Sequence, residues 1–174
     1  MVQKIMSVLI RPETSTDVIA IEQVTIAAFT GKPYSNQTEH LIVNALRASD
    51  ALSLSLVAEM NEEIIGHIAF SKVAIDDRDL NWYGIGPVSV SPSNQKQGVG
   101  TKLIREGMIT IHKLGALGCV LEGSPNYYQR FGFKSYEGLI YKGAPAPEYF
   151  MAFPFTDEIP QGKVEFHKSF YIHA

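Results

Sequence analysis

The chain has 174 residues, of which 45% are hydrophobic and 19% charged, and its formal net charge is -3. This length and composition predict a single domain over residues 1–174 and exclude an intrinsically disordered chain. The slightly acidic balance argues against nucleic acid as a partner, because binding to phosphates requires a concentration of Lys and Arg.

Cys119 is the only cysteine, which excludes an internal disulfide and a cysteine-based zinc site. We expect no bound metal, because metal-ligand spacing is also absent among His40, His112, His167 and His173. No apolar stretch approaches the ~20 residues needed to span a bilayer, so we expect no membrane partner. Met1–Pro12 lacks the pattern of a secretion signal, and we therefore expect a cytoplasmic protein.

The first half of the chain predicts one strand, two helices and then three strands. Apolar residues recur at helical spacing before Phe29, and they alternate with other residues from Leu52 onward. The predicted elements are a strand at Met6–Arg11, helices at 17–29 and Thr38–Ala48, and strands at Leu52–Ala58, Ile64–Val73 and Trp82–Val90.

The second half returns to helical spacing and predicts a β-α-β unit. Val99, Leu103 and Ile104 mark the apolar face of the helix, and Gly115 stands where a helix-ending glycine belongs. The mixture of an antiparallel meander with this unit indicates a mixed α+β fold. The predicted elements are a helix at Gly98–Leu114, a strand at Cys119–Glu122, a short helix at Asn126–Arg130, and strand-like segments at Lys134–Ile140, Tyr149–Phe155 and Val164–Ile172.

A glycine-containing loop between the strand ending at Val90 and the next helix carries the strongest functional signal. It reads Gln95-x-x-Gly98-x-Gly100 and is followed by the cap-competent Thr101. Such a turn gathers unpaired backbone N–H groups at the positive end of a helix dipole, and glycine lets a ligand approach the backbone. The loop is therefore suited to bind phosphates.

Other phosphate and hydrolase motifs fit the chain poorly. A dinucleotide-binding loop needs G-x-G-x-x-G and a later acidic residue in a parallel sheet, and a nucleotide P-loop needs Gly-Lys-Ser/Thr. The G-x-S-x-G turn of hydrolases is absent. The loop thus favours an anionic ligand of another kind.

A second motif, Tyr-Tyr-Gln-Arg-Phe-Gly-Phe at Tyr127–Phe133, follows the loop after one helix and one strand. Together the two motifs resemble the GNAT superfamily of acyl-CoA-dependent N-acyltransferases, within a branch of mostly uncharacterised bacterial predicted N-acetyltransferases. The resemblance covers a core at about 8–155, which leaves 156–174 as a C-terminal extension. It implies a mainly antiparallel central sheet with helices on both faces, whose fourth and fifth strands splay apart near Val88 and Val120.

The resemblance implies acetyl-CoA as co-substrate, with its acetyl group moving to a primary amine by direct transfer in a ternary complex. The amine belongs to a small molecule or a peptide, and the oligomeric state stays open, with a homodimer allowed. Two alternatives remain, a non-catalytic acyl-CoA-binding or regulatory module and transfer of a longer acyl chain. The residues expected to bind the co-substrate are Val88, Ser89, Val90, Gln95, Lys96, Gln97, Gly98, Val99, Gly100 and Thr101.

The resemblance assigns a general acid, and the proposed reaction also requires a base. Tyr128 matches the general acid that returns a proton to the departing thiolate, although it could also simply pack under the co-substrate. An amine with a pKa of ~10.4 must first lose a proton, and Glu122 is a candidate base or else a solvated strand end. His67 is a candidate proton relay or else a buried core residue. Ser124, where many relatives carry Asp or His, cannot act as a base at neutral pH.

The acceptor pocket of this superfamily is commonly lined by the loop between the first two helices. The resemblance therefore points to Tyr34, Phe29 and Trp82 as aromatic residues that shape this pocket.

Overall fold

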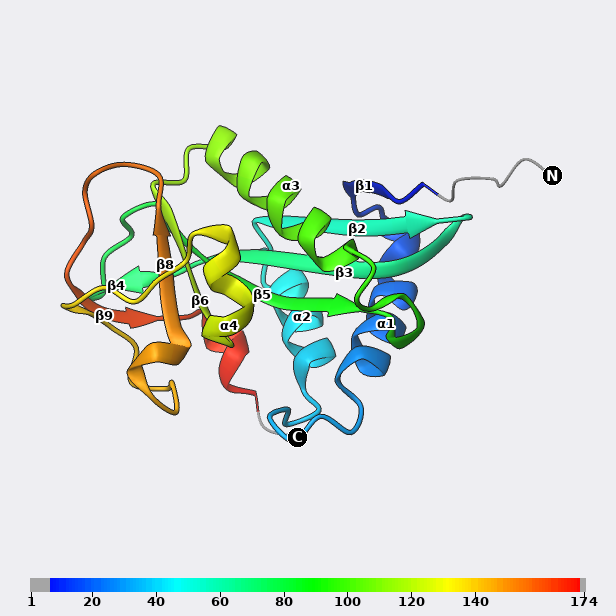
Figure 1. The fold of residues 1–174 in the computed structure, drawn as a ribbon, viewed down its shortest axis with the longest axis horizontal. Coiled ribbons are helices and arrows are strands. Elements are labelled where there is room, and N and C mark those ends of the chain that lie inside the picture. The colour runs from blue at the N-terminus through cyan, green and yellow to red at the C-terminus, as the bar shows by residue number, and fades with distance from the viewer. Residues whose placement is uncertain (1–6, 173–174) are drawn as a thin grey trace.

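The computed structural model describes residues 7–172 of the chain and is drawn in Figure 1. Its strands and helices, in chain order, are β1 (Leu9–Pro12), α1 (Val18–Phe29), α2 (Glu39–Ala48), β2 (Leu54–Met60), β3 (Glu63–Lys72), β4 (Ala74–Ile75), β5 (Trp82–Val90), α3 (Val99–Lys113), β6 (Gly118–Glu122), α4 (Pro125–Tyr128), β7 (Leu139–Ile140), β8 (Phe150–Pro154) and β9 (Gly162–Glu165). Short 3-10 helices lie at η1 (Ser15–Asp17), η2 (Pro92–Asn94), η3 (Gln129–Phe131), η4 (Pro147–Tyr149) and η5 (Lys168–Tyr171).

Within the described residues, six strands form a central sheet in the order β1-β2-β3-β5-β6-β8. Neighbouring strands are antiparallel except for β5 and β6, which are parallel and joined by α3. A second sheet of the short strands β4, β9 and β7 stands beside it. The mixed α+β fold with a mainly antiparallel sheet is thereby confirmed.

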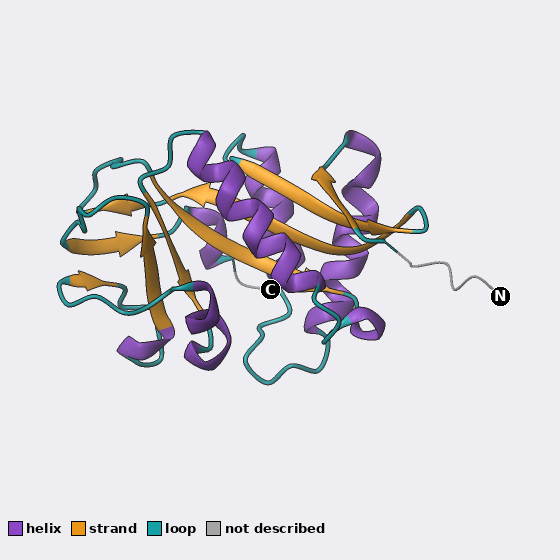
Figure 2. Ribbon diagram, turned by 45° about the horizontal axis from the view of Figure 1, so that its top comes forward, coloured by secondary structure: helices purple, strands orange, loops and turns teal. Residues whose placement is uncertain are grey.

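Helices cover both faces of the central sheet. Helix α3 crosses one face, and α1 and α2 lie on the other, as Figures 1 and 2 show. Both Leu56 and its neighbour Val57 are consequently buried, at 3% and 0% exposure, although strand alternation points them to opposite faces. The sequence pattern of alternating Leu and Ser around residue 54 therefore understates how apolar the surroundings of β2 are.

Strands β5 and β6 separate after a short paired stretch. Their pairing covers three residue pairs, from Trp82 opposite Gly118 to Gly84 opposite Val120. Beyond Gly84, β5 continues to pair with β3, and the rest of β6 pairs with β8. Figure 1 shows β6 and β8 turning steeply away from the forward half of β5. The splayed strands that the sequence predicted are present.

The backbone of Val88 faces the gap between the splayed strands. Ser91, directly after β5, donates its N–H to the carbonyl of Ile65 in β3, at 2.8 Å. In an antiparallel strand alternate residues direct their backbone groups to the same side, so Ser89 also faces β3 and Val88 faces the other way. Val88 therefore offers an N–H and a carbonyl to whatever enters the gap.

Three predicted elements differ from the structure. The segment predicted as a strand at Lys134–Ile140 is mostly irregular, and only its end forms β7. The predicted C-terminal strand Val164–Ile172 is wrong beyond Glu165, because the chain turns into η5. The predicted first strand begins at Leu9, and Met6 lies outside the described residues. A strand of two residues is too short to produce a period in the sequence, which is why β4 was not predicted and the bounds of β7 were overextended.

A buried carboxylate ties the first strand to the first helix. Asp17 is 6% exposed and accepts hydrogen bonds from Arg11 Nη1 at 2.7 Å and from the backbone N–H of Thr14 at 2.7 Å. Arg11 also forms an ion pair with Glu59 of β2 at 2.6 Å. These bonds lower the pKa of Asp17 to about 2, with the Arg11 hydrogen bond as the largest cause.

Candidate active site

The loop before α3 has the geometry of an anion-binding turn. Lys96 and Gly98 both have positive φ angles, 61° and 84°, and α3 begins directly afterwards at Val99. The first N–H groups of a helix have no partner inside it, so the turn directs them outward with the positive end of the dipole. A side chain on Gly98 would meet no atom within 4 Å, so the space in front of this loop is open.

Two glutamine side chains of this loop hold its shape. Gln95 Nε2 donates to the carbonyl of Val90 at 3.0 Å, and Gln97 Nε2 donates to the carbonyl of Ser93 at 3.2 Å. Both amides are therefore engaged with the backbone around η2 and tie the loop to the end of β5. The sequence predicted both glutamines as binding residues. In the structure their side chains stabilise the loop that directs the first N–H groups of α3 outward.

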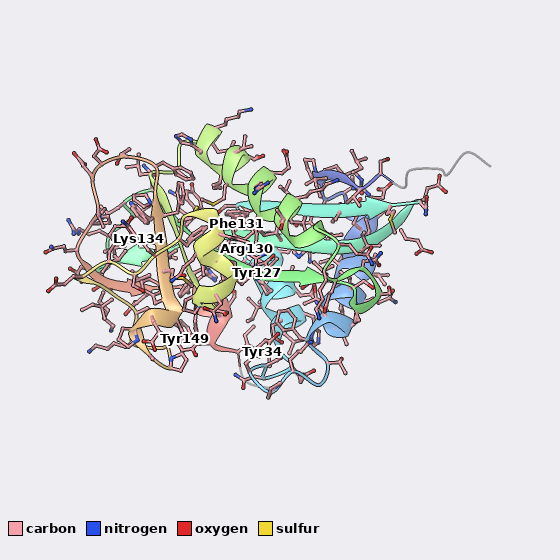
Figure 3. The ribbon with its side chains drawn as sticks, viewed as in Figure 1. Tyr34, Tyr127, Arg130, Phe131, Lys134 and Tyr149 are labelled. Carbon is pink, nitrogen blue, oxygen red and sulfur yellow. The ribbon has the colours of Figure 1, made fainter. Side chains whose placement is uncertain are left out.

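The two sequence motifs meet in the structure. The hydroxyl of Tyr127 in α4 lies beside the backbone of Gly100 in the first turn of α3. Arg130 holds this tyrosine from the other side, with Cζ 4.6 Å from the ring centroid and Nε donating to its carbonyl at 2.9 Å. Figure 3 shows Tyr127, Arg130 and Phe131 close together along α4 and η3. Sequence analysis assigned no role to Arg130, which brings a positive charge next to Tyr127.

Tyr128 is packed against the end of β6. A side chain on Gly123 would collide with its ring, and Tyr127 and Phe133 contact it edge-on with centroid separations of 4.9 and 6.2 Å. Burial raises the pKa of Tyr128 well above the usual range of a phenol, and Tyr127 and Tyr34 raise it further. The phenol is therefore protonated at neutral pH and available as a hydrogen-bond or proton donor.

Glu122 ends β6 directly before Gly123, the residue on which Tyr128 packs. Its side chain is exposed to solvent, yet the surrounding protein removes enough water to raise the pKa of its carboxyl. Within the described residues it has no ion-pair partner. A carboxylate with a raised pKa is a better proton acceptor than an ordinary glutamate.

His67 lies inside the sheet and is fully buried, with 0% exposure. Its Nε2 is 2.7 Å from Ser55 Oγ, and its Nδ1 has no hydrogen-bond partner among the described residues. It stands opposite Ser89 in the pairing of β3 with β5, and the hydroxyl of Ser89 is likewise buried without a partner there. Burial lowers the pKa of His67 to about 3, so the imidazole is neutral at physiological pH.

The three aromatic residues expected at the acceptor pocket lie at different places in the structure. Tyr34, in the loop between α1 and α2, is 76% exposed and close enough to Tyr128 to influence its pKa. Trp82 is 2% exposed and packs against Gly118 at the opposite end of β6, so its assignment to the pocket was wrong. Phe29 ends α1 and lines a small hollow of about 170 Å³ between α1 and α2.

A groove of about 520 Å³ lies between α3 on one side and η3 with the end of β8 on the other. Its walls are mostly apolar and aromatic, and two arginines, Arg105 and Arg130, stand in it. Since Arg130 also contacts Tyr127, the groove begins next to the anion-binding loop. Its lining residues are Ile104, Arg105, Met108, Ile109, His112, Arg130, Phe131, Phe153 and Phe155.

Two negative findings concern the described residues only. Between residues 7 and 172, no group of three or more His, Cys, Asp and Glu side chains is arranged to hold a metal ion. Over the same range, no helix combines the length and the apolar character that crossing a membrane requires.

Comparison with known proteins places this geometry in a family. A model of the acetyltransferase (GNAT) domain matches residues 51–135. The uncharacterised N-acetyltransferase YhbS of Escherichia coli K12 is 34% identical over 117 residues, which are 67% of this chain and 70% of YhbS. The uncharacterised N-acetyltransferase YjhQ of the same strain is 32% identical over 136 residues, 76% of this chain and 71% of YjhQ.

Solved structures agree with the sequence matches. A GNAT family acetyltransferase from Brucella melitensis, crystallised in complex with acetyl-CoA, is 48% identical with a TM-score of 0.85, covering 95% of this chain and 99% of its own. Escherichia coli YhbS, crystallised in complex with CoA, is 28% identical with a TM-score of 0.91, covering 100% of this chain and 97% of its own. The chain belongs to the GNAT acetyltransferase family and is an N-acetyltransferase of that family.

Proposed function

We propose that this N-acetyltransferase uses acetyl-CoA as its co-substrate and acetylates a primary amine by direct transfer in a ternary complex. The observation that carries the proposal is the gap between β5 and β6, which opens directly beside the anion-binding turn of α3. The complexes of the Brucella melitensis acetyltransferase with acetyl-CoA and of YhbS with CoA support the same ligand here. Acetyl-CoA supplies an activated thioester, whose carbon–sulfur bond breaks as the amine nitrogen bonds to the acetyl carbon.

The residues around the gap fit such a ligand. The first-turn N–H groups of α3 and the open space at Gly98 suit a diphosphate, with Lys96, Arg105 and Arg130 as nearby positive charges. The free backbone groups of Val88 suit the amides of the pantetheine arm, which would extend the sheet as an added strand does. Ser89, which faces β3, would contribute through the shape of the strand rather than through its backbone.

Tyr128 is the proposed general acid. It remains protonated because burial raises its pKa, and it stands at the end of β6 where the gap is widest. A buried phenol is a weaker acid than a free one, but a thiolate that forms in the same water-poor gap is also a stronger base. The transfer of the proton to sulfur is therefore compatible with the burial of both partners.

Glu122 is the proposed base, and it accepts the proton that the attacking nitrogen loses. Its raised pKa and its solvent exposure suit proton acceptance followed by release to water. His67 takes part, on this proposal, only as a relay that passes protons without storing charge, because its pKa is about 3. Its unpartnered Nδ1 and the hydroxyl of Ser89 are the two groups that such a relay would use.

A matched pair of variants tests binding of the co-substrate. Gly98 and Gly115 flank the two ends of α3, both have positive φ angles (84° and 101°), and both face open space. Glutamate at either position therefore costs similar backbone strain, but only Gly98→Glu puts a negative charge in the phosphate site. We expect Gly98→Glu to weaken acetyl-CoA binding in calorimetry at least about 100-fold, and Gly115→Glu to leave it unchanged.

Equal loss of binding in both variants, or no binding by the wild type at millimolar acetyl-CoA, would contradict the proposal. Measurement of turnover distinguishes the enzyme from the non-catalytic alternative. If the chain binds acetyl-CoA but releases no thiol with any member of a panel of primary amines, it is an acyl-CoA-binding module of the same fold. A panel of longer acyl-CoAs, measured with the best amine, decides the acyl length.

A further inference from the structure

The C-terminal extension reaches back to the end of β6. After β9 the chain forms η5, which packs against α2. Tyr171 of η5 is 48% exposed. Its neighbour Phe170 contacts Phe166 with a ring-centroid separation of 5.1 Å, and Phe166 in turn contacts the ring of Tyr141 edge-on at 4.9 Å. The 29 residues between Tyr141 and Tyr171 include β8 and β9, so these ring contacts close a long loop of chain over one side of the molecule.

The two tyrosines adjoin the carboxylate at the end of β6. Burial raises the pKa of the Tyr141 phenol well above its usual range, and the nearby Tyr171 and the negative charge of Glu122 raise it further. The ring of Tyr141 is fixed from behind by Phe150, which pairs with Glu122 across β6 and β8, at a centroid separation of 5.5 Å. Glu122 thus has aromatic rings on one side, those of Phe150, Tyr141 and Tyr171, which we call the tyrosine wall. Tyr171 belongs to the C-terminal extension.

Further tyrosines stand on the same side of the molecule. The carbonyl of Tyr149 accepts a hydrogen bond from the N–H of Gly123 at 2.8 Å, which places η4 next to Glu122. Tyr34 approaches Tyr128 from the loop between α1 and α2. Figure 3 shows Tyr34 and Tyr149 toward this end, away from the bulk of α3.

Charge is distributed unequally between the two sides of the gap. The side of the anion-binding turn carries Lys96, Arg105 and Arg130. On the side of the tyrosines, Glu122 has no ion-pair partner within the described residues, and Lys142 and Lys168 are the positive charges nearest in sequence to Tyr141 and Tyr171. A carboxylate flanked by tyrosine rings attracts an ammonium group, through both charge and the faces of the rings. The same surroundings repel a carboxylate on the ligand.

We infer that Tyr171 and Tyr141 complete the acceptor subsite beside Glu122, and that this subsite takes a cationic primary amine on an apolar body with no carboxylate next to the nitrogen. The inference rests on the proposed function and names the acceptor class for the same site. The ammonium group binds Glu122, and the apolar body lies against the tyrosine wall. Glu122 then accepts a proton from the group that it has bound.

The probes are 2-phenylethylamine and phenylalanine, which share an aromatic body and differ by a carboxylate next to the nitrogen. Each is titrated into the protein saturated with CoA, which isolates acceptor binding from turnover. We expect 2-phenylethylamine to bind at least about tenfold more tightly than phenylalanine, because the carboxylate would stand near Glu122. Phenylalanine binding equally well would overturn the inference.

Variants identify the residues of the subsite. Glu122→Gln and Tyr171→Ala are each expected to weaken 2-phenylethylamine binding at least about fivefold, with unchanged affinity for CoA. Tyr136→Phe is the matched control, since Tyr136 lies under Lys134, with Nζ 5.1 Å from its ring centroid, and is assigned to neither site. Unchanged amine binding in Tyr171→Ala would overturn the role of the extension. Absence of CoA binding by the wild type would instead refute the proposed function, so the two failures are distinct.

Discussion

The hydroxyl of Tyr127 lies 2.8 Å from the position that a Cβ atom would take on Gly100. The second glycine of the loop motif and the first aromatic residue of the second motif are thus in contact, although 26 residues separate them in the chain. Tyr127 is in turn held by Arg130, so α4 covers the first turn of α3. The proposed phosphate site therefore depends on the contact between the two motifs.

Gly100→Ala should weaken acetyl-CoA binding by displacing Tyr127. Alanine favours the helix by up to ~1 kcal/mol, so we expect little loss of thermal stability, while the Kd measured by calorimetry rises about tenfold. Adding Tyr127→Phe removes the oxygen that the methyl group meets, and the double variant should recover most of the affinity. Additive effects of the two substitutions would contradict the coupling.

Tyr128→Phe should lower turnover and spare co-substrate binding. Loss of a general acid typically reduces the rate by about 100-fold or more, whereas the ring of phenylalanine keeps the packing against Gly123. Thiol release with the best amine measures kcat, and calorimetry measures the affinity for acetyl-CoA. Tyr136→Phe serves as control, and a Tyr128→Phe enzyme with wild-type kcat would withdraw the proposed role.

Asp17 should make the free energy of unfolding depend on pH in the acidic range. Its pKa is about 2 in the folded chain, against 3.8 for an unperturbed carboxyl in the unfolded chain. Its contribution to stability is therefore complete above about pH 5 and is lost as the pH falls through 3.8 toward 2. The shift corresponds to about 2 kcal/mol of unfolding free energy at pH 7. Urea unfolding of Asp17→Asn should show this deficit at pH 7 and a smaller one at pH 2.5.

Asp79→Asn provides the matched control for Asp17. Asp79 pairs with Lys72 at 2.6 Å, but its side chain is 55% exposed, so its loss should cost less than about 0.5 kcal/mol. A deficit in Asp17→Asn that stays constant from pH 7 to pH 2.5 would show that the pKa of Asp17 is not lowered by folding.

Cys119 should not react with thiol reagents in the folded chain. It has 0% exposure in β6, and burial raises the pKa of its thiol, so very little reactive thiolate exists. Ellman's reagent should detect one thiol per chain in denaturant and none within minutes under native conditions. Rapid native labelling would mean that β6 opens readily, and it would also disturb thiol-release assays.

The parts of the fold with strong periodic patterns were predictable from the sequence. The strand Trp82–Val90 has the predicted bounds, and the predicted helix Gly98–Leu114 differs from α3 by one residue at each end. Both lie where apolar spacing and glycines agree, because burial of a long amphipathic face dominates local structure. The anion-binding turn could be located for the same reason.

The acceptor side could not be predicted in the same way. Only the family resemblance pointed to Tyr34, and nothing in the sequence pointed to Tyr141 or Tyr171. The tertiary fold places Tyr141 against Phe150, which pairs with Glu122 at the end of β6. No spacing rule relates these tyrosines, and an isolated tyrosine in a loop is usually a packing residue. The burial of His67 also follows from helices covering both sheet faces, which a single strand pattern does not report.

The three-residue pairing of β5 with β6 leaves the central sheet with two free edges in its interior. Exposed edges commonly invite pairing with foreign strands, but these two diverge, and α4 and its aromatic ring contacts lie where they part. On the proposed function, a bound molecule rather than the polypeptide would make the sheet continuous at this point. Amide hydrogen exchange at Val88 should accordingly slow when the gap is filled, which reports occupancy without any chemistry taking place.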